Sequence, residues 1–164
     1  MKLLRDPQSL NKIIRQISGK RKTIGFVPTM GALHQGHLSL IKQAVKDNHI
    51  VVVSIFVNPA QFGPKEDLKK YPRPLKKDLG LCRKAGVDLV FLPGSKIMYA
   101  QGFSTFVDVK GLSSVLCGVS RPGHFRGVAT IVVKLLNIVE PNALYLGQKD
   151  AQQAIIITRM IKDL

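Results

Sequence analysis

The chain has 164 residues, of which 45% are hydrophobic, enough to bury the core of one domain. Its 25 Lys and Arg residues outnumber its 10 Asp and Glu residues, which gives a net charge of +15 at pH 7. No apolar run approaches the ~20 residues of a membrane-spanning helix, and residues 1–7 lack the apolar centre of a signal peptide. Because Cys82 and Cys117 are isolated from each other, we expect a reduced, cytoplasmic protein without a membrane partner.

The predicted elements alternate between helices and strands along the chain. The first helix begins at Asp6 and Pro7, which form a cap followed by proline, and ends at Gly19. Strands are predicted at 23–27, 50–57, 88–92, 105–109 and 143–146, and further helices near 37–48, 74–85, 123–139 and 150–163. The strand at 50–57 is apolar on both faces, as is typical of a central parallel strand. The sequence therefore predicts the α/β class, with a doubly wound, mostly parallel sheet and helices on both faces.

Three polar loops follow predicted strands, at 28–37, 58–63 and 147–150. In doubly wound sheets, ligands bind outside the carboxyl ends of the strands, where the strand order reverses. We therefore expect the three loops to meet at one edge of the sheet and to form a ligand site. The alternative is that they are three surface turns that hold no ligand.

The loop at 28–37 carries two histidines, His34 and His37, at a strand-to-helix turn. A helix N-terminus offers unpaired N–H donors and a partial positive charge, and Gly31 and Gly36 allow close approach to the backbone. Imidazole donors there can stabilise the charge that moves onto a leaving pyrophosphate. A metal site is the other interpretation of two such histidines, but no further ligand has suitable spacing, so we predict none. The pattern resembles the H-x-G-H signature of nucleotidyltransferases, which cut a nucleoside triphosphate at the α-phosphate.

The other two loops carry uncharged and charged polar side chains. Gln61 has both a donor and an acceptor for a substrate hydroxyl and carboxylate, or it is a simple turn residue. Lys149 suits a polyphosphate, and Asp150 could instead cap the last helix. Gln153 lies one helical turn beyond Asp150, on the same face.

A basic segment opens the long helix predicted at 123–139. Its side chains are Arg121, His124 and Arg126. Anion binding suits a helix N-terminus with basic side chains, and a basic surface cap is the competing interpretation.

Six segments, in order between residues 23 and 163, resemble the pantoate–β-alanine ligase family: GFVPTMGALHQGHLSLI, VVVSIFVNPAQFGP, YPRPLKKDL, AGVDLVFLP, LCGVSRPGHFRGVAT and YLGQKDAQQ. The resemblance implies a Rossmann-like fold and a homodimer. It also implies a two-step reaction without a covalent enzyme intermediate. The carboxylate of pantoate attacks the α-phosphate of MgATP and releases pyrophosphate; the amine of β-alanine then attacks the acyl carbonyl, giving pantothenate and AMP.

The resemblance also implies roles for single residues. His37 is the catalytic donor and His34 its phosphate-binding neighbour. Gln61 and Gln153 hold pantoate, and Gln61 also meets β-alanine. Arg121 and His124 act either at the site or at a subunit interface. The ATP site, with Mg²⁺ bound to ATP, is implied to consist of Met30, Gly31, Ala32, Leu33, His34, Gln35, Gly36, His37, Gly147, Gln148, Lys149 and Asp150.

Three features depart from the family. Gln35 stands where glutamate is common, and the charge of +15 is unusual. The sequence ends at Leu164, whereas the family continues into a smaller C-terminal domain that closes over the triphosphate. We therefore expect residues 1–164 to be the N-terminal ATP- and pantoate-binding domain, with weak ATP binding and little activity alone.

Two rival functions remain to be compared with this one. Another nucleotidyltransferase, acting on a phosphate ester, would share His34 and His37 but has no reason to keep VNPAQFGP or SRPGHFRG. A polyanion or nucleic-acid binder is suggested by the charge, but the basic clusters lack the interleaved aromatic residues of a single-strand binder. The sequence therefore predicts small-molecule substrates and no nucleic-acid partner.

Overall fold

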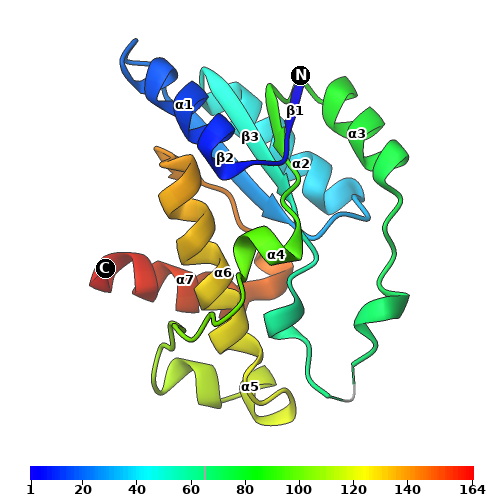
Figure 1. Ribbon diagram of the computed structural model, residues 1–164, viewed down its shortest axis with the longest axis vertical. Coiled ribbons are helices and arrows are strands. Elements are labelled where there is room, and N and C mark those ends of the chain that lie inside the picture. The colour runs from blue at the N-terminus through cyan, green and yellow to red at the C-terminus, as the bar shows by residue number, and fades with distance from the viewer. Residues whose placement is uncertain (65) are drawn as a thin grey trace.

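A five-stranded sheet forms the centre of the computed structural model, which describes residues 1–64 and 66–164 (Figure 1). Its strands are β1 (Lys2–Leu4), β2 (Ile24–Thr29), β3 (Ile50–Ile55), β4 (Leu89–Phe91) and β5 (Ala143–Leu144). All neighbours are parallel, in the order β1-β4-β3-β2-β5. The chain steps outward from β2 through β3 to β4, then returns to β5 on the other side of β2. Strand order therefore reverses at β2, which is where such sheets bind ligands.

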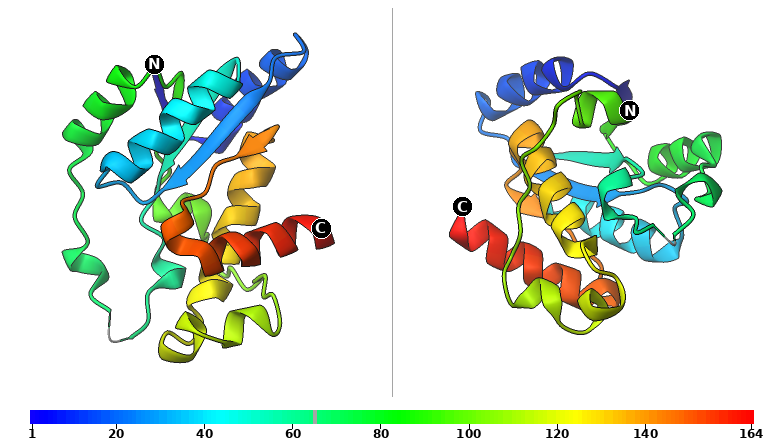
Figure 2. Two further views of the ribbon diagram at one scale, coloured as in Figure 1. Left: turned by 180° about the vertical axis from the view of Figure 1, so that it is seen from behind. Right: turned by 60° about the horizontal axis from the view of Figure 1, so that its bottom comes forward.

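Helices cover both faces of the sheet, as predicted. The α-helices are α1 (Pro7–Ser18), α2 (Gln35–Asp47), α3 (Leu75–Lys84), α4 (Ser95–Met98), α5 (Cys117–Ser120), α6 (His124–Val139) and α7 (Ala151–Asp163). Figure 1 shows the face covered by α1 and α6, and the left view of Figure 2 shows the face covered by α2. Along β2, Phe26 is buried in the core that includes α1, α6 and α7, while Val27 is buried in the core that includes α2 and α3. This alternation follows from the two-residue period of a strand.

The predicted helices agree with the structure to within two residues at each end. The first begins as expected, with Asp6 as its cap: the Asp6 carboxylate accepts a hydrogen bond from the Ser9 N–H at 2.7 Å. The second starts at Gln35 rather than near residue 37. This earlier start makes His34 the capping residue and places His37 within the first turn.

The strand predicted at 105–109 is wrong. These residues form no strand and lie along α6 instead. The Val107 N–H donates to Thr130 Oγ1 at 2.9 Å, and the Phe106 ring lies under the Arg126 guanidinium at 4.2 Å. Contacts with a helix therefore replace the strand partner that the β-forming composition suggested.

The sequence prediction missed the edge strand β1 and the short helices α4 and α5. Strand β1 pairs with β4 in register Leu4 with Phe91, so it delivers Arg5 to the carboxyl edge of the sheet. Within residues 1–64 and 66–164, no helix is both long and apolar enough to cross a membrane.

Candidate functional site

A cleft of about 700 Å³ opens at the carboxyl ends of β2, β3 and β5, with α6 as one wall. Its apolar wall comes from Val128, Ile131, Val132 and Leu135 of α6. The three predicted loops therefore do converge. The predicted residues that line the cleft are Met30, His34, Gly36, His37, Gln61, Gly147, Gln148, Lys149, Asp150 and Gln153.

Four predicted residues, Gly31, Ala32, Leu33 and Gln35, are not among those that line the cleft. The backbone turns away from the cleft here, through left-handed conformations at Gly31 (φ +84°) and Ala32 (φ +50°). The N–H groups of Ala32 and Leu33 donate to the two oxygens of the Asp78 carboxylate, at 2.9 and 2.8 Å. These amides are therefore occupied within the protein.

Asp78 is a structural residue that sequence reasoning missed. Its side chain is only 1% exposed, and it reaches from α3 to the histidine loop 45 residues earlier. A carboxylate that accepts two N–H bonds holds a turn firmly, since charge-assisted bonds are the stronger kind. One signal was available: Asp78 is the single acidic residue of α3, which otherwise carries four basic residues.

The two histidines cap α2 with their rings. Nδ1 of His34 accepts from the Gly36 N–H at 3.1 Å, and Nδ1 of His37 accepts from the His34 N–H at 3.4 Å. The ring centroids lie 4.1 Å apart. Because Nδ1 accepts in both rings, the neutral tautomer carries its proton on Nε2. Each ring can thus offer an Nε2–H donor to a ligand in the cleft.

The protonation state of His37 can be predicted from its surroundings. Partial burial is the main cause that lowers its pKa below the ordinary value of 6.5, and the neighbouring His34 lowers it further. The neutral form of His37 is therefore favoured over the cation more than in an ordinary histidine.

We predict that nitrogen-detected NMR finds His37 in the Nε2–H tautomer, with a titration midpoint below 6.5. Replacing His34 by alanine removes the second cause, so the pKa of His37 rises. His49→Ala is the matched control, since His49 contacts Thr23 outside the cleft and should leave the midpoint unchanged. A His37 proton on Nδ1 would contradict the assignment.

Gln61 is held ready by neighbours inside the cleft. Its side chain is 8% exposed; Oε1 accepts from Asn58 Nδ2 at 3.0 Å, and Nε2 donates to the Met30 sulfur at 3.2 Å. Asn58 in turn accepts from the Tyr99 hydroxyl at 2.7 Å, and burial raises the pKa of Tyr99 to about 12, so this group stays a donor. A thioether is a weak acceptor. A ligand carboxylate or hydroxyl can therefore replace the sulfur as the partner of Gln61.

Arg121 and His124 hold the Gln61 loop from outside the cleft. His124 Nδ1 donates to the Gln61 carbonyl at 2.9 Å, and its Nε2 accepts from Arg121 Nη1 at 3.1 Å. Arg121 also pairs with Glu66 at 2.7 Å, and Glu66 accepts from the Gly63 N–H at 2.8 Å. Neither basic residue lines the cleft, so in this structure they position the loop and leave the anion contacts to other groups.

Gly127 lets α6 approach this loop closely. A Cβ at position 127 would overlap the carbonyl oxygen of Ala60 and lie 2.7 Å from the Gln61 Cα. We predict that Gly127→Ala lowers the free energy of unfolding by about 1–3 kcal/mol, the usual cost of overpacking. Urea unfolding measures this change. The control is Gly80→Ala in α3, where a Cβ meets no atom within 4 Å. Because alanine is the better helix former, this substitution should not lower the free energy of unfolding and should raise it by about 1 kcal/mol or less. Equal effects of the two substitutions would contradict the role of Gly127.

The third loop supplies the charged groups of the cleft. Asp150 occupies the capping position of α7, but its side chain makes no capping hydrogen bond. Its carboxylate is thus available to the cleft, beside Lys149, and it is the one carboxylate among the residues that line it. Gln153 lines the cleft one turn further along α7. Within the described part of the chain, no three His, Cys, Asp or Glu side chains are grouped to hold a metal ion.

Comparisons with known proteins agree with this geometry. A family model described as pantoate-beta-alanine ligase matches residues 2–164. Curated relatives named pantothenate synthetase, from Acetivibrio thermocellus and Thermosipho africanus, are each 56% identical over 164 residues. The whole chain is matched, and it spans 58% and 59% of the length of these two relatives.

Solved structures give the same result. A crystal structure of pantothenate synthetase from Thermus thermophilus has a TM-score of 0.94 at 47% identity, covering 99% of this chain and 58% of its own. A second, of pantoate-beta-alanine ligase from Francisella tularensis complexed with beta-gamma ATP and beta-alanine, has a TM-score of 0.95 at 44% identity. It covers 99% of this chain and 62% of its own.

Proposed function

Because the chain belongs to the pantoate–β-alanine ligase family, we propose that the full-length protein condenses pantoate with β-alanine in an ATP-dependent reaction. In the first step a pantoate carboxylate oxygen bonds to the α-phosphorus of ATP, and pyrophosphate leaves with its bond electrons. In the second step the β-alanine amine attacks the acyl carbonyl, loses a proton, and AMP leaves. The observation that carries the proposal is the cleft that joins His34 and His37 with Gln61 and Gln153.

The histidine turn supports the first step. The Nε2–H groups of His37 and His34 would donate to phosphate oxygens, and the α2 N-terminus adds its partial positive charge. Lys149 at the opposite loop would bind another phosphate oxygen. These donors stabilise the charge that develops on the pyrophosphate, so the rate gain comes from electrostatics and positioning.

The chemistry of the cleft also fits Mg²⁺ carried by the triphosphate. Mg²⁺ is commonly bound through one or two carboxylates together with substrate phosphates. Asp150 provides one such carboxylate, and it has no capping role that would compete. When bound, the ion would neutralise part of the phosphate charge.

The glutamine side of the cleft suits pantoate. Gln61 and Gln153 offer uncharged donors and acceptors for its hydroxyl and carboxylate groups, and Gln61 would also meet β-alanine. The apolar wall formed by Val128, Ile131 and Val132 matches the dimethyl carbon of pantoate. The cleft therefore offers partners for both the polar groups and the branched apolar body of such an acid.

We also propose, following the family, a cytoplasmic homodimer. The support in this chain is apolar surface on and beside α5, where Leu116 is 77% exposed and Val119 is 70% exposed. Exposed apolar groups that cluster are typical of protein interfaces. The mass of the full-length protein in solution, measured by light scattering, tests the homodimer. A dimer is expected, and a monomer at micromolar concentration would contradict the proposal.

The order of the two steps gives a direct test of the proposed function, because pyrophosphate must leave before β-alanine reacts. The full-length protein with ATP and pantoate, but no β-alanine, should release pyrophosphate. ATP with β-alanine alone should release none. Pyrophosphate release that needs a phosphate-ester substrate instead of pantoate would favour the rival nucleotidyltransferase.

A further inference from the structure

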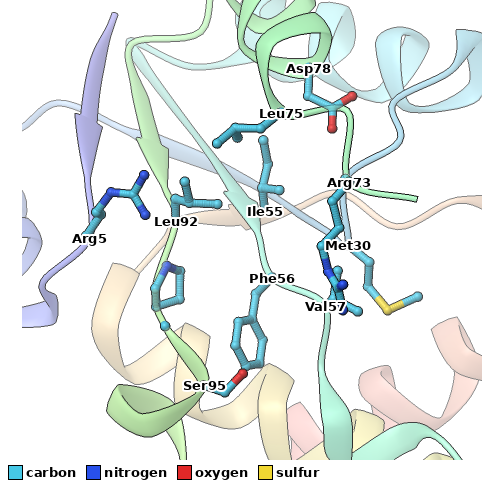
Figure 3. A pocket seen from close by; sticks show the side chains of 13 residues that line it. Arg5, Met30, Ile55, Phe56, Val57, Arg73, Leu75, Asp78, Leu92 and Ser95 are labelled. Atoms are coloured by element: carbon cyan, nitrogen blue, oxygen red, sulfur yellow. The ribbon is translucent and has the colours of Figure 1, made fainter. Parts of the chain in front are cut away.

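A second pocket, of about 390 Å³, lies at the same edge of the sheet but beyond β2, and the proposed reaction does not use it. It is formed where β1, β3 and β4 end. Figure 3 shows an apolar floor of Ile55, Leu75 and Leu92 between two arginines, with Arg5 on one side and Arg73 on the other. Its size falls within the range of roughly 300–1,000 Å³ that is typical of small-molecule sites.

The pocket carries an excess of positive charge. Arg5 follows β1 and Arg73 precedes α3, so two distant segments bring their guanidinium groups to one pocket. Arg73 Nη2 donates a hydrogen bond to the Leu68 carbonyl at 3.2 Å. The guanidinium group has five N–H donors, so most of them remain available. Among the ion pairs of the described residues, neither arginine has an acidic partner.

The one carboxylate that lines the pocket among the described residues, Asp78, forms no ion pair with either arginine. Asp78 already accepts the N–H groups of Ala32 and Leu33 with its two oxygens. Its negative charge lowers the positive potential of the pocket, but with two arginines in the lining the pocket stays net positive. An anion on the apolar floor would thus lie in a net positive pocket.

We propose that this pocket binds a small organic anion, with a short branched apolar body on Ile55, Leu75 and Leu92 and a carboxylate or phosphate group that pairs with Arg5 or Arg73 at the edge of that floor. Guanidinium groups suit both headgroups, because their planar donors match two oxygens at once. An uncharged ligand of the same shape gains only the apolar contacts.

The pocket shares a wall with the substrate cleft. Met30 and Phe56 line both cavities, and the Met30 sulfur is the partner of Gln61 Nε2. An anion that moves the Met30 side chain changes the partner of Gln61. We therefore expect occupancy to alter the affinity of the cleft for pantoate, a consequence that rests on the proposed function, whereas binding itself does not.

Methyl NMR on the protein, without ATP or pantoate, tests the binding. The probes are isovalerate and isobutyl phosphate, with uncharged isovaleramide as the control ligand. The Ile55 methyl reports on this pocket alone, and the Ile131 methyl reports on the cleft alone. Either anion should shift Ile55 in a saturable way, whatever the response of Ile131, because a branched acid can also enter the cleft. A response to one anion only identifies the headgroup as carboxylate or phosphate.

Two variants test the arginines. At least one of Arg5→Gln and Arg73→Gln should weaken binding by about tenfold or more, as expected for the loss of a charge-assisted pair. Arg15→Gln, on the exposed side of α1, is the matched control and should bind normally. The proposal is overturned if neither anion shifts Ile55, if isovaleramide binds equally well, or if both variants keep normal affinity. Because no substrate is present, such a failure leaves the proposed reaction untouched.

The coupling between the pocket and the cleft is tested by a separate measurement, the affinity for the anionic probe in the presence of pantoate. By reciprocity, pantoate must change the affinity for the anionic probe by the same factor that the probe changes the affinity for pantoate. The expected result is an altered apparent Kd of the probe in saturating pantoate. An unchanged Kd would overturn the coupling through Met30.

Discussion

Replacing His37 by alanine in the full-length protein is expected to lower pantoate-dependent pyrophosphate release by about 100- to 1,000-fold, the usual effect of losing one preorganised donor. The ring stands in the first turn of α2, where its Nδ1 is tied to the His34 N–H and its Nε2–H is left for the ligand. The substitution removes the donor without touching the core. Fixed-time assays of pyrophosphate release, with saturating ATP and pantoate, measure the effect.

Two control variants separate catalysis from helix capping. His37→Gln keeps an acceptor in the third helical position, as in an ordinary capping box, but moves the donor; it should preserve the fold and still lose activity. His49→Ala removes a histidine that contacts Thr23 outside the cleft and should leave activity unchanged. Pyrophosphate release near the unmodified rate in His37→Ala would refute the role given to this residue.

Removing the Asp78 carboxylate is expected to have the largest effect on stability. Asp78→Ala should lower the free energy of unfolding by about 3 kcal/mol, because it leaves two loop amides without their charged acceptor. The left-handed backbone at Gly31 and Ala32 then loses its restraint, and the histidine turn loses its shape. Urea unfolding followed by circular dichroism measures the loss.

An aspartate at the surface provides the comparison. Asp67 also accepts backbone N–H groups, from Lys69 and Lys70, but it is exposed, and its ion pair with Lys70 lies in solvent. Asp67→Ala should cost about 1 kcal/mol or less. If Asp78→Ala were equally mild, the carboxylate would not be what holds the histidine loop.

The alternation of strands and helices was predictable because each element carries its own apolar period. The convergence of the loops at 28–37, 58–63 and 147–150 was also predictable, since parallel strands end at one edge. The resemblance supplied the identities of the proposed ligands. In contrast, the strand predicted at 105–109 failed because Thr130 of α6 competes for its backbone, a contact that local composition does not reveal.

The support around the site could not be predicted for a similar reason. Asp78 and His124 bond to partners 45 and 63 residues away in the chain, and Asn58 also donates to the carbonyl of Gly127, 69 residues away. Apart from the single acidic residue of α3, no local pattern marks such contacts. The two histidines were recognised from their turn, but their capping role depends on the start of α2 at Gln35, two residues earlier than the apolar pattern indicated.

In the proposed first step, AMP is transferred to the pantoate carboxylate, and an isotope experiment follows the oxygen atom on which this step depends. Pantoate labelled with ¹⁸O in both carboxylate oxygens is incubated with ATP, β-alanine and the full-length protein. The mass of the AMP produced is then measured by mass spectrometry. If a pantoate oxygen bonds to the α-phosphorus, that oxygen leaves with AMP, so each AMP gains one ¹⁸O. Unlabelled AMP formed together with pantothenate would contradict the account.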